Sequence, residues 1–272
     1  MRTVKSKDGT RIAFDQLGNG PVVILVGGAT TTRADTYPLA EALAPHFTVL
    51  NYDRRGRDDS GDTAPYAVER EVEDIEALID AAGQTASLFG HSSGAVLALE
   101  AARQLPDKIG KLALYEPPFI VDDSRPPVPT DYVAQLNAAV AAGRPGDALA
   151  IFMTQAVGMP AEVVPQMREA PFWATSEAVA HTIAYDGTIM GDTMRGNPAA
   201  LQKWRSVRNP TLVIDGGESA AWMHRATQAL ADVLPNAQRL TLAGQTHGAA
   251  TEVLAPVLVT FFAGQGQAGH DR

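Results

Sequence analysis

Short apolar runs alternate with helical patterns along most of the chain. Residues 22–26 and 47–52 are apolar runs with the length of buried strands, and a short helix through residues 38–43 separates them. Between residues 68 and 79, apolar side chains recur at helical spacing with Glu and Asp on the other side, which predicts an amphipathic helix. This alternation indicates a mostly parallel sheet with helices on both faces.

Turn residues divide the rest of the N-terminal half. Asp8-Gly9 and the turn at residues 18–21 bracket a strand at residues 11–15, so we expect the first strands to pair antiparallel. Further along, an apolar strand at residues 86–89 runs into a glycine-flanked turn. A helical stretch at residues 95–104 and a strand at residues 111–115 complete this unit.

The pattern changes after residue 116. A proline-rich stretch is followed by helical segments without a convincing strand, which predicts a helical cap inserted at residues 117–205. Strand and helix patterns then resume, at residues 211–214, 222–233, 239–242 and 252–262. The expected organisation is therefore a core of residues 1–116 and 206–263, the cap, and a frayed Gly- and Gln-rich tail at residues 264–272.

Composition narrows the class of protein. A chain of 272 residues with 45% hydrophobic content can bury one large core. Its net charge of -9 and lack of a basic cluster argue against nucleic acid as a partner. The absence of cysteine excludes disulfides, thiolate nucleophiles and thiolate metal sites. A polar N-terminus and the lack of a long apolar run predict a soluble, cytoplasmic protein that does not enter membranes.

The glycine-flanked turn is the strongest chemical signal in the chain. Gly90-His91-Ser92-Ser93-Gly94 matches G-x-S-x-G between a strand and a helix, the context of a nucleophile elbow. A side chain on such a tight turn has crowded backbone dihedrals, so the positions two before and two after it must be nearly free of side chain. The helix beginning at Ser93 points its N–H groups at the space above Ser92 and favours an anion there. We therefore predict Ser92 as a nucleophile.

Together with other stretches, this elbow resembles the α/β-hydrolase fold family with an inserted cap. The resembling stretches lie in the family's order, at residues 22–28, 52–57 with 60–61, 90–94, 212–217 and 245–247. The resemblance covers all but the tail and implies an α/β fold with a mostly parallel sheet. It also implies a serine esterase that uses no cofactor or metal and cleaves carboxylic esters of small to medium size through an acyl-enzyme, with lactonase or thioesterase activity as variants.

The resemblance assigns the oxyanion hole and the general base. In the family, a backbone N–H of the loop after the first parallel strand joins the N–H after the nucleophile, which here implies Ala29 and Ser93. The family's usual His-Gly pair is replaced by two glycines, but the donor is a backbone group. The base follows the last strand, where His247 stands. His91, inside the elbow, is expected to point away from the site.

The sequence assigns the acid of the catalytic triad less directly than the nucleophile and the base. Family members often carry an aspartate in the loop after the strand at residues 211–214, but the matching place holds Ser219. Three carboxylates are available, at Glu116, Glu218 and Asp215. We choose Glu116, because some relatives place the acid after the strand that follows the elbow helix, and we keep Glu218 as the alternative.

The sequence is compatible with two other functions. A cofactor-free perhydrolase or haloperoxidase-like enzyme would use the same three residue types, and a non-catalytic ligand-binding homologue would explain the missing aspartate. Metal and dinucleotide sites are disfavoured, because neither paired ligand spacing nor a G-x-G-x-x-G turn is present. The charges at residues 54–59 are expected to pair with one another. Large apolar side chains of the cap are candidates to line a substrate pocket: Met153, Phe172, Trp173, Tyr185 and Met190.

Overall fold

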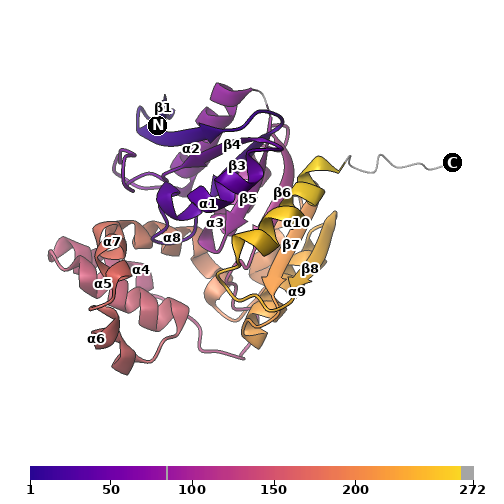
Figure 1. Ribbon diagram of the computed structural model, residues 1–272. Helices are drawn as coiled ribbons and strands as arrows, with labels where there is room; N and C mark the ends of the chain where they lie inside the picture. The colour runs from indigo at the N-terminus through magenta and orange to yellow at the C-terminus, as the bar shows by residue number, and fades with distance from the viewer. Residues whose placement is uncertain (84, 265–272) are drawn as a thin grey trace.

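The computed structural model describes residues 1–83 and 85–264, and these form one sheet with helices on both faces (Figure 1). Within them, eight strands lie in the order β1-β2-β4-β3-β5-β6-β7-β8. All neighbours from β4 to β8 are parallel, which confirms the predicted class. The strands are Arg2–Lys5 (β1), Arg11–Leu17 (β2), Val22–Val26 (β3), Thr48–Tyr52 (β4), Ala86–His91 (β5), Ile109–Tyr115 (β6), Thr211–Gly216 (β7) and Ala237–Leu242 (β8).

The antiparallel start of the sheet is also as predicted. β1 and β2 pair antiparallel on either side of the Asp8-Gly9 turn, with Lys5 opposite Arg11. β2 then pairs antiparallel with β4 and not with β3, which follows it in the chain. The parallel part of the sheet therefore begins at β4 and β3, and the carboxyl ends of β3 to β8 meet at one edge.

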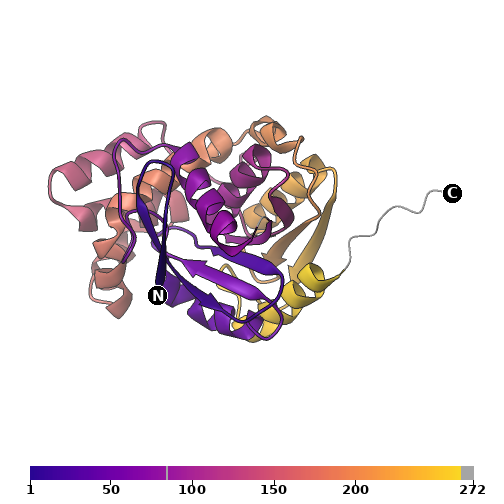
Figure 2. The ribbon, with the colours of Figure 1, turned by 90° about the horizontal axis from the view of Figure 1, so that it is seen from above.

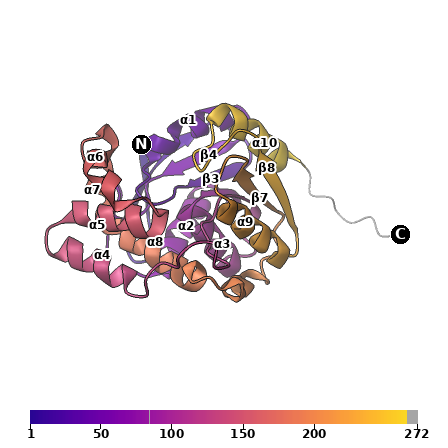
Figure 3. The same ribbon diagram turned by 90° about the horizontal axis from the view of Figure 1, so that it is seen from below.

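Two groups of helices cover the two faces (Figure 3). On one face, α2 (Val68–Ala82), α3 (Ser93–Gln104) and α9 (Ala221–Val233) pack into the larger apolar core. On the other face, α1 (Arg33–Leu43) and α10 (Thr251–Ala263) pack against each other and into a second core. The predicted apolar face of α2 is confirmed, because Val72, Ile75, Leu78 and Ile79 are buried, but Glu71 and Asp74 of the same helix are buried as well.

Between β6 and β7 the described chain forms helices and turns but no strand. We call residues 117–205 the insert; its position as a separate cap stays a prediction. Figures 1 and 2 show α4 to α7 to one side of the sheet, away from α10, while α8 contacts α3 of the core. The described elements of the insert are α4 (Tyr132–Ala141), α5 (Pro145–Ile151), a π-helix (Phe152–Val157), α6 (Val164–Met167), α7 (Pro171–Ala178), α8 (Ile183–Met190) and four 3₁₀ turns (Ala161–Val163, Ala180–Thr182, Gly191–Met194, Pro198–Trp204).

Two further expectations concern the ends of the chain and the membrane. Apart from Gly264, the tail predicted to fray lies outside the described residues. Among the residues that are described, none of the helices combines the length and the apolar character needed to cross a bilayer.

Candidate active site

Ser92 occupies a strained turn between β5 and α3. Its backbone has φ 56° and ψ -127°, a conformation that side-chain-bearing residues rarely adopt. A Cβ on Gly90 would lie 2.5 Å from Cα of Ala95, and one on Gly94 would lie 2.2 Å from the carbonyl oxygen of Val26. Both positions therefore require glycine, because a Cβ would overlap backbone atoms, as the sequence predicted.

Glu116 and His247 meet at the carboxyl edge of the sheet. Oε2 of Glu116 lies 2.7 Å from Nδ1 of His247, and Oε1 accepts a hydrogen bond of 2.7 Å from the N–H of Gly216. Glu116 is fully buried, which disfavours its charge, but the hydrogen bonds from His247 and Gly216 outweigh burial and lower its pKa. An ionised Glu116 accepts a hydrogen bond from the N–H at Nδ1 of His247, which leaves Nε2 of the ring as the free acceptor.

Ser92 and His247 line the same cavity but are not hydrogen-bonded to each other in the described structure. Catalytic hydrogen bonds are often long before substrate binds and tighten in the complex. The geometry thus supplies a fixed Glu116–His247 pair and a serine exposed to the same space.

The two other carboxylates have different surroundings. Asp215 is fully buried at the end of β7 and accepts hydrogen bonds of 2.6 Å from both His224 and Thr241. Glu218 is exposed and lines the cavity, and its side chain makes no hydrogen bond to His247 in the described structure. Of the three carboxylates that the sequence left open, Glu116 is the one that contacts the imidazole ring of His247.

His91 does not point away from the site, so that expectation was wrong. Its Nε2 lies 2.8 Å from the carbonyl oxygen of His247, and the two rings are 4.7 Å apart between centroids. Desolvation, with a smaller contribution from His247, lowers the pKa of His91 to about 4, so its neutral ring donates to that carbonyl. The hydroxyl of Tyr115 donates to the adjacent carbonyl of Thr246. Two side chains therefore hold consecutive carbonyls of the His247 loop, because β5, β6 and this loop end at one edge of the sheet.

The candidate oxyanion donors, Ala29 and Ser93, both line the cavity beside Ser92. A Cβ on Gly28 would lie 3.0 Å from Cβ of Ser92, so the backbone of the loop after β3 passes directly against the serine. The first N–H groups of a helix have no partner within the helix, which leaves that of Ser93 free to face the cavity. The replacement of the family's histidine by Gly27 therefore leaves the backbone donors in reach of Ser92.

The cavity has a volume of about 590 Å³ and a largely apolar wall built from the insert and α9. Of the predicted pocket residues, Met153 and Met190 line it, but Phe172, Trp173 and Tyr185 do not. Trp173 is buried within the insert, and Tyr185 stacks on Tyr66. Most of the apolar wall was not predicted from the sequence; it also includes Pro118, Tyr132, Phe152, Ala156, Val157, Met194, Trp222 and Met223.

The charges at residues 54–59 do not pair with one another, contrary to expectation. Arg54 binds Glu71 and Asp186, and Arg57 also binds Asp186, from the insert. Arg55 binds Asp8 and Asp74. The partners lie on other elements because the three arginine side chains are buried, whereas Asp58 and Asp59 remain nearer to solvent.

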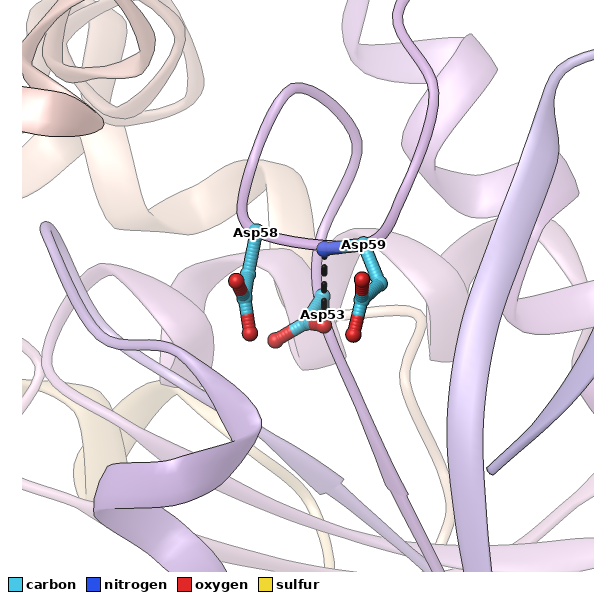
Figure 4. Close-up of side chains that lie close together, drawn as sticks. All are labelled: Asp53, Asp58 and Asp59. Carbon is cyan, nitrogen blue, oxygen red and sulfur yellow. Dashed lines mark hydrogen bonds between the residues drawn. The ribbon is translucent and has the colours of Figure 1, made fainter.

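Asp58 and Asp59 instead gather around Asp53 at the end of β4 (Figure 4). Carboxylate oxygens of the three residues lie within 4.8 Å of one another, a spacing that could hold a metal ion. The guanidinium of Arg33 takes that place, since it donates to Asp53 and Asp59 and lies 3.9 Å from Asp58. The chain's own cation thus contacts all three carboxylates and offsets part of their negative charge.

Comparison with known proteins agrees with the fold. Residues 22–256 match the model of a family described as the Alpha/beta hydrolase family. A crystal structure of an alpha/beta hydrolase from Sphaerobacter thermophilus DSM 20745 is 57% identical with a TM-score of 0.89, covering 96% of this chain and all of that one. An enol-lactonase from Burkholderia xenovorans LB400 shares the fold at 21% identity, with a TM-score of 0.70 over 97% of this chain and 100% of that chain.

A curated relative covers a shorter stretch. The uncharacterized hydrolase YraK of Bacillus subtilis (strain 168) is 32% identical over 113 residues, which is 40% of this chain and 42% of that protein. The match therefore spans less than half of the relative's length. The family model, in contrast, spans most of the chain, from β3 to α10. The chain therefore belongs to the alpha/beta hydrolase family.

Proposed function

We propose that the protein is a serine hydrolase that cleaves carboxylic esters of small to medium size through an acyl-enzyme intermediate. The hydrogen bond of 2.7 Å between Glu116 and Nδ1 of His247 carries this proposal. It prepares His247 as a base at the wall of the cavity into which Ser92 projects from its strained turn.

The chemistry follows from these positions. Oγ of Ser92 attacks the ester carbonyl while Nε2 of His247 takes the hydroxyl proton, and Glu116 stabilises the imidazolium that forms. The N–H groups of Ala29 and Ser93 stabilise the negative charge on the carbonyl oxygen. His247 then gives its proton to the leaving alcohol, and water releases the acyl group by the same steps in reverse order.

The cavity supports a substrate with a neutral apolar part. Among the described residues that line it, none is Lys or Arg, and most of the wall between the insert and α9 is apolar. A volume of about 590 Å³ suits a small or medium ester. Lactones pass through the same tetrahedral intermediate, and the enol-lactonase with the same fold supports testing them as a second class. In this proposal the insert acts as the cap that shapes the pocket.

A fluorophosphonate probe, followed by peptide mass spectrometry, tests the function. We expect labelling at Ser92 in the wild type and none in Ser92→Ala or His247→Ala, with hydrolysis of 4-nitrophenyl butyrate lost in parallel. A folded wild type that remains unlabelled and inactive on short 4-nitrophenyl esters and lactones would count against the proposal and favour a ligand-binding homologue.

A further inference from the structure

Asp186 joins the insert to the elbow. It lies on α8 and is buried, with 4% of its surface exposed. Its carboxylate accepts hydrogen bonds from Oγ of Ser93 at 2.7 Å, Nη1 of Arg54 at 2.6 Å and Nη2 of Arg57 at 2.7 Å. One carboxylate of the insert is therefore bonded to the residue after the nucleophile and to two arginines that follow β4.

Arg57 extends this contact to the loop after β3. Its Nη1 donates to the carbonyl oxygen of Gly28 and, at 3.0 Å, to that of Thr31. The carbonyl of Gly28 and the N–H of Ala29 belong to one planar peptide unit. Holding the oxygen therefore sets the direction of the N–H. A cation on the carbonyl also polarises the peptide unit and makes that N–H a stronger donor.

Ser93 supplies the other oxyanion donor through its backbone. Its hydroxyl is held by Asp186, so its side chain is bonded to the insert while its N–H begins α3. Asp186 is thus bonded to one donor residue directly and to the peptide unit of the other through Arg57. Both proposed donors depend on the same carboxylate.

The charges of this cluster are balanced. Arg54 makes two hydrogen bonds of 2.7 Å to Glu71, so two arginines face two carboxylates, and all four side chains are buried. Burial disfavours the charge of Asp186, but Arg54 and Arg57 outweigh it and lower the pKa of Asp186. Without the charge of Asp186, two buried guanidinium groups would face Glu71 alone, and Arg57 would lose the partner that orients it toward Gly28.

We propose that Asp186 and Arg57 are positioning residues for the oxyanion hole, so that docking of α8 on the core sets the N–H groups of Ala29 and Ser93. The inference rests on the proposed function, since it presumes that these two groups bind the oxyanion. It adds that the insert controls the rate of the chemical step as well as the shape of the pocket.

The test uses Asp186→Asn and Ser93→Ala, with Asp74→Asn as the matched control. Asp74 is equally buried and binds Arg55 at 2.7 and 2.8 Å, and Arg55 bonds to neither Gly28 nor Ser93. The readouts are kcat and KM for 4-nitrophenyl butyrate, and the Ki of a trifluoromethyl ketone, which forms an oxyanion adduct with an active serine. All are measured below the melting temperature of every variant.

A positioning role separates kcat from KM. We expect kcat to fall about 10²-fold in Asp186→Asn and about 10-fold in Ser93→Ala, which keeps its backbone N–H, with Ki weakened in parallel and KM changed less than about threefold. Asp74→Asn should keep both kcat and Ki. The idea is overturned if Asp186→Asn and Ser93→Ala match Asp74→Asn in kcat and Ki. Ser93→Ala decides alone if Asp186→Asn does not fold.

Failure of the proposed function has a different signature. In that case the wild type itself is unlabelled by the fluorophosphonate, whereas failure of the positioning role leaves the wild type labelled and active. If the wild type is unlabelled, the positioning role is tested by a readout that does not depend on turnover. We expect the amide resonances of Ala29 and Ser93 in ¹⁵N-labelled protein to shift in Asp186→Asn but not in Asp74→Asn. Unchanged resonances in Asp186→Asn would refute the positioning role.

Discussion

Replacing Glu116 by Gln changes one atom and should disable the base. The N–H of Gly216 donates to Oε1 of Glu116, so the amide of Gln is expected to keep its oxygen at that place. Its NH₂ group then faces Nδ1 of His247, where Oε2 now lies at 2.7 Å. Because both would be donors, the ring must move its proton to Nε2. In that tautomer Nε2 cannot accept the proton of Ser92.

The magnitude follows from this tautomer change. An equivalent substitution of the triad acid in a serine protease lowers kcat about 10⁴-fold without disturbing the geometry. We expect a loss of about 10³- to 10⁴-fold in kcat for Glu116→Gln, or about 4 to 5.5 kcal/mol of transition-state stabilisation. KM should change little, because Glu116 is fully buried.

The assay is steady-state hydrolysis of 4-nitrophenyl butyrate at neutral pH, with circular dichroism to show that each variant is folded. Glu218→Gln is the comparison, because Glu218 lines the cavity without bonding to His247. It should lose less than about tenfold, since no proton transfer depends on it. The reasoning is refuted if Glu116→Gln keeps more than about a tenth of kcat while Glu218→Gln loses more.

Three further outcomes are expected. Gly94→Ala places a Cβ 2.2 Å from the carbonyl oxygen of Val26. Urea denaturation should therefore show a loss of at least about 1–3 kcal/mol in the free energy of unfolding, and kcat should fall about 10²-fold. Gly110→Ala is the control: its Cβ would have Oγ of Ser87 as nearest neighbour at 3.3 Å, and both quantities should change little. The folded-state pKa of Glu116 is lowered, so its charge stabilises the fold above its ordinary pKa and this stabilisation is lost as pH falls through the lowered one. The difference in unfolding free energy between wild type and Glu116→Gln should therefore shrink on acidification, and a constant difference would contradict the assignment. His91 has a pKa of about 4, so its ring resonances should stay constant down to about pH 5; titration near neutrality would show that the ring is not desolvated.

The elbow could be predicted from sequence because its constraints are local. Five consecutive residues, Gly90 to Gly94, carry both Ser92 and the glycines that its turn requires. The turn leaves no space for side chains at Gly90 and Gly94, and in the structure backbone atoms lie 2.5 and 2.2 Å from where their Cβ atoms would be. The strand on one side and the helix on the other supplied the remaining context.

The carboxylate that bonds to His247 was harder to predict, because several carboxylates follow neighbouring strands. β6 and β7 are adjacent and parallel, so Glu116, Asp215 and Glu218 all lie near one edge of the sheet. Which of them faces His247 depends on backbone direction at the strand end. Glu116 has a φ of 47°, and that turn of the chain has no signature in the amino-acid sequence.

The contacts of Asp186 could not be predicted at all. It lies 93 positions from Ser93 and 129 from Arg57, in a segment where helical patterns carried no motif. The error at residues 54–59 has the same origin, because the partners of those arginines lie far away in the sequence. Likewise, the direction of His91 is set by a carbonyl 156 positions away.

The buried contacts of Asp186 bear on how this protein can be recombined. Residues 117–205 connect the carboxyl end of β6 to the amino end of β7, so a chimaera could exchange them for the corresponding segment of a relative without interrupting any strand. Such a graft would still replace Asp186, the carboxylate that forms salt bridges with Arg54 and Arg57 of the core. A donor segment without a carboxylate at the place of Asp186 should yield an inactive or unstable hybrid, unless both arginines are replaced in the same design.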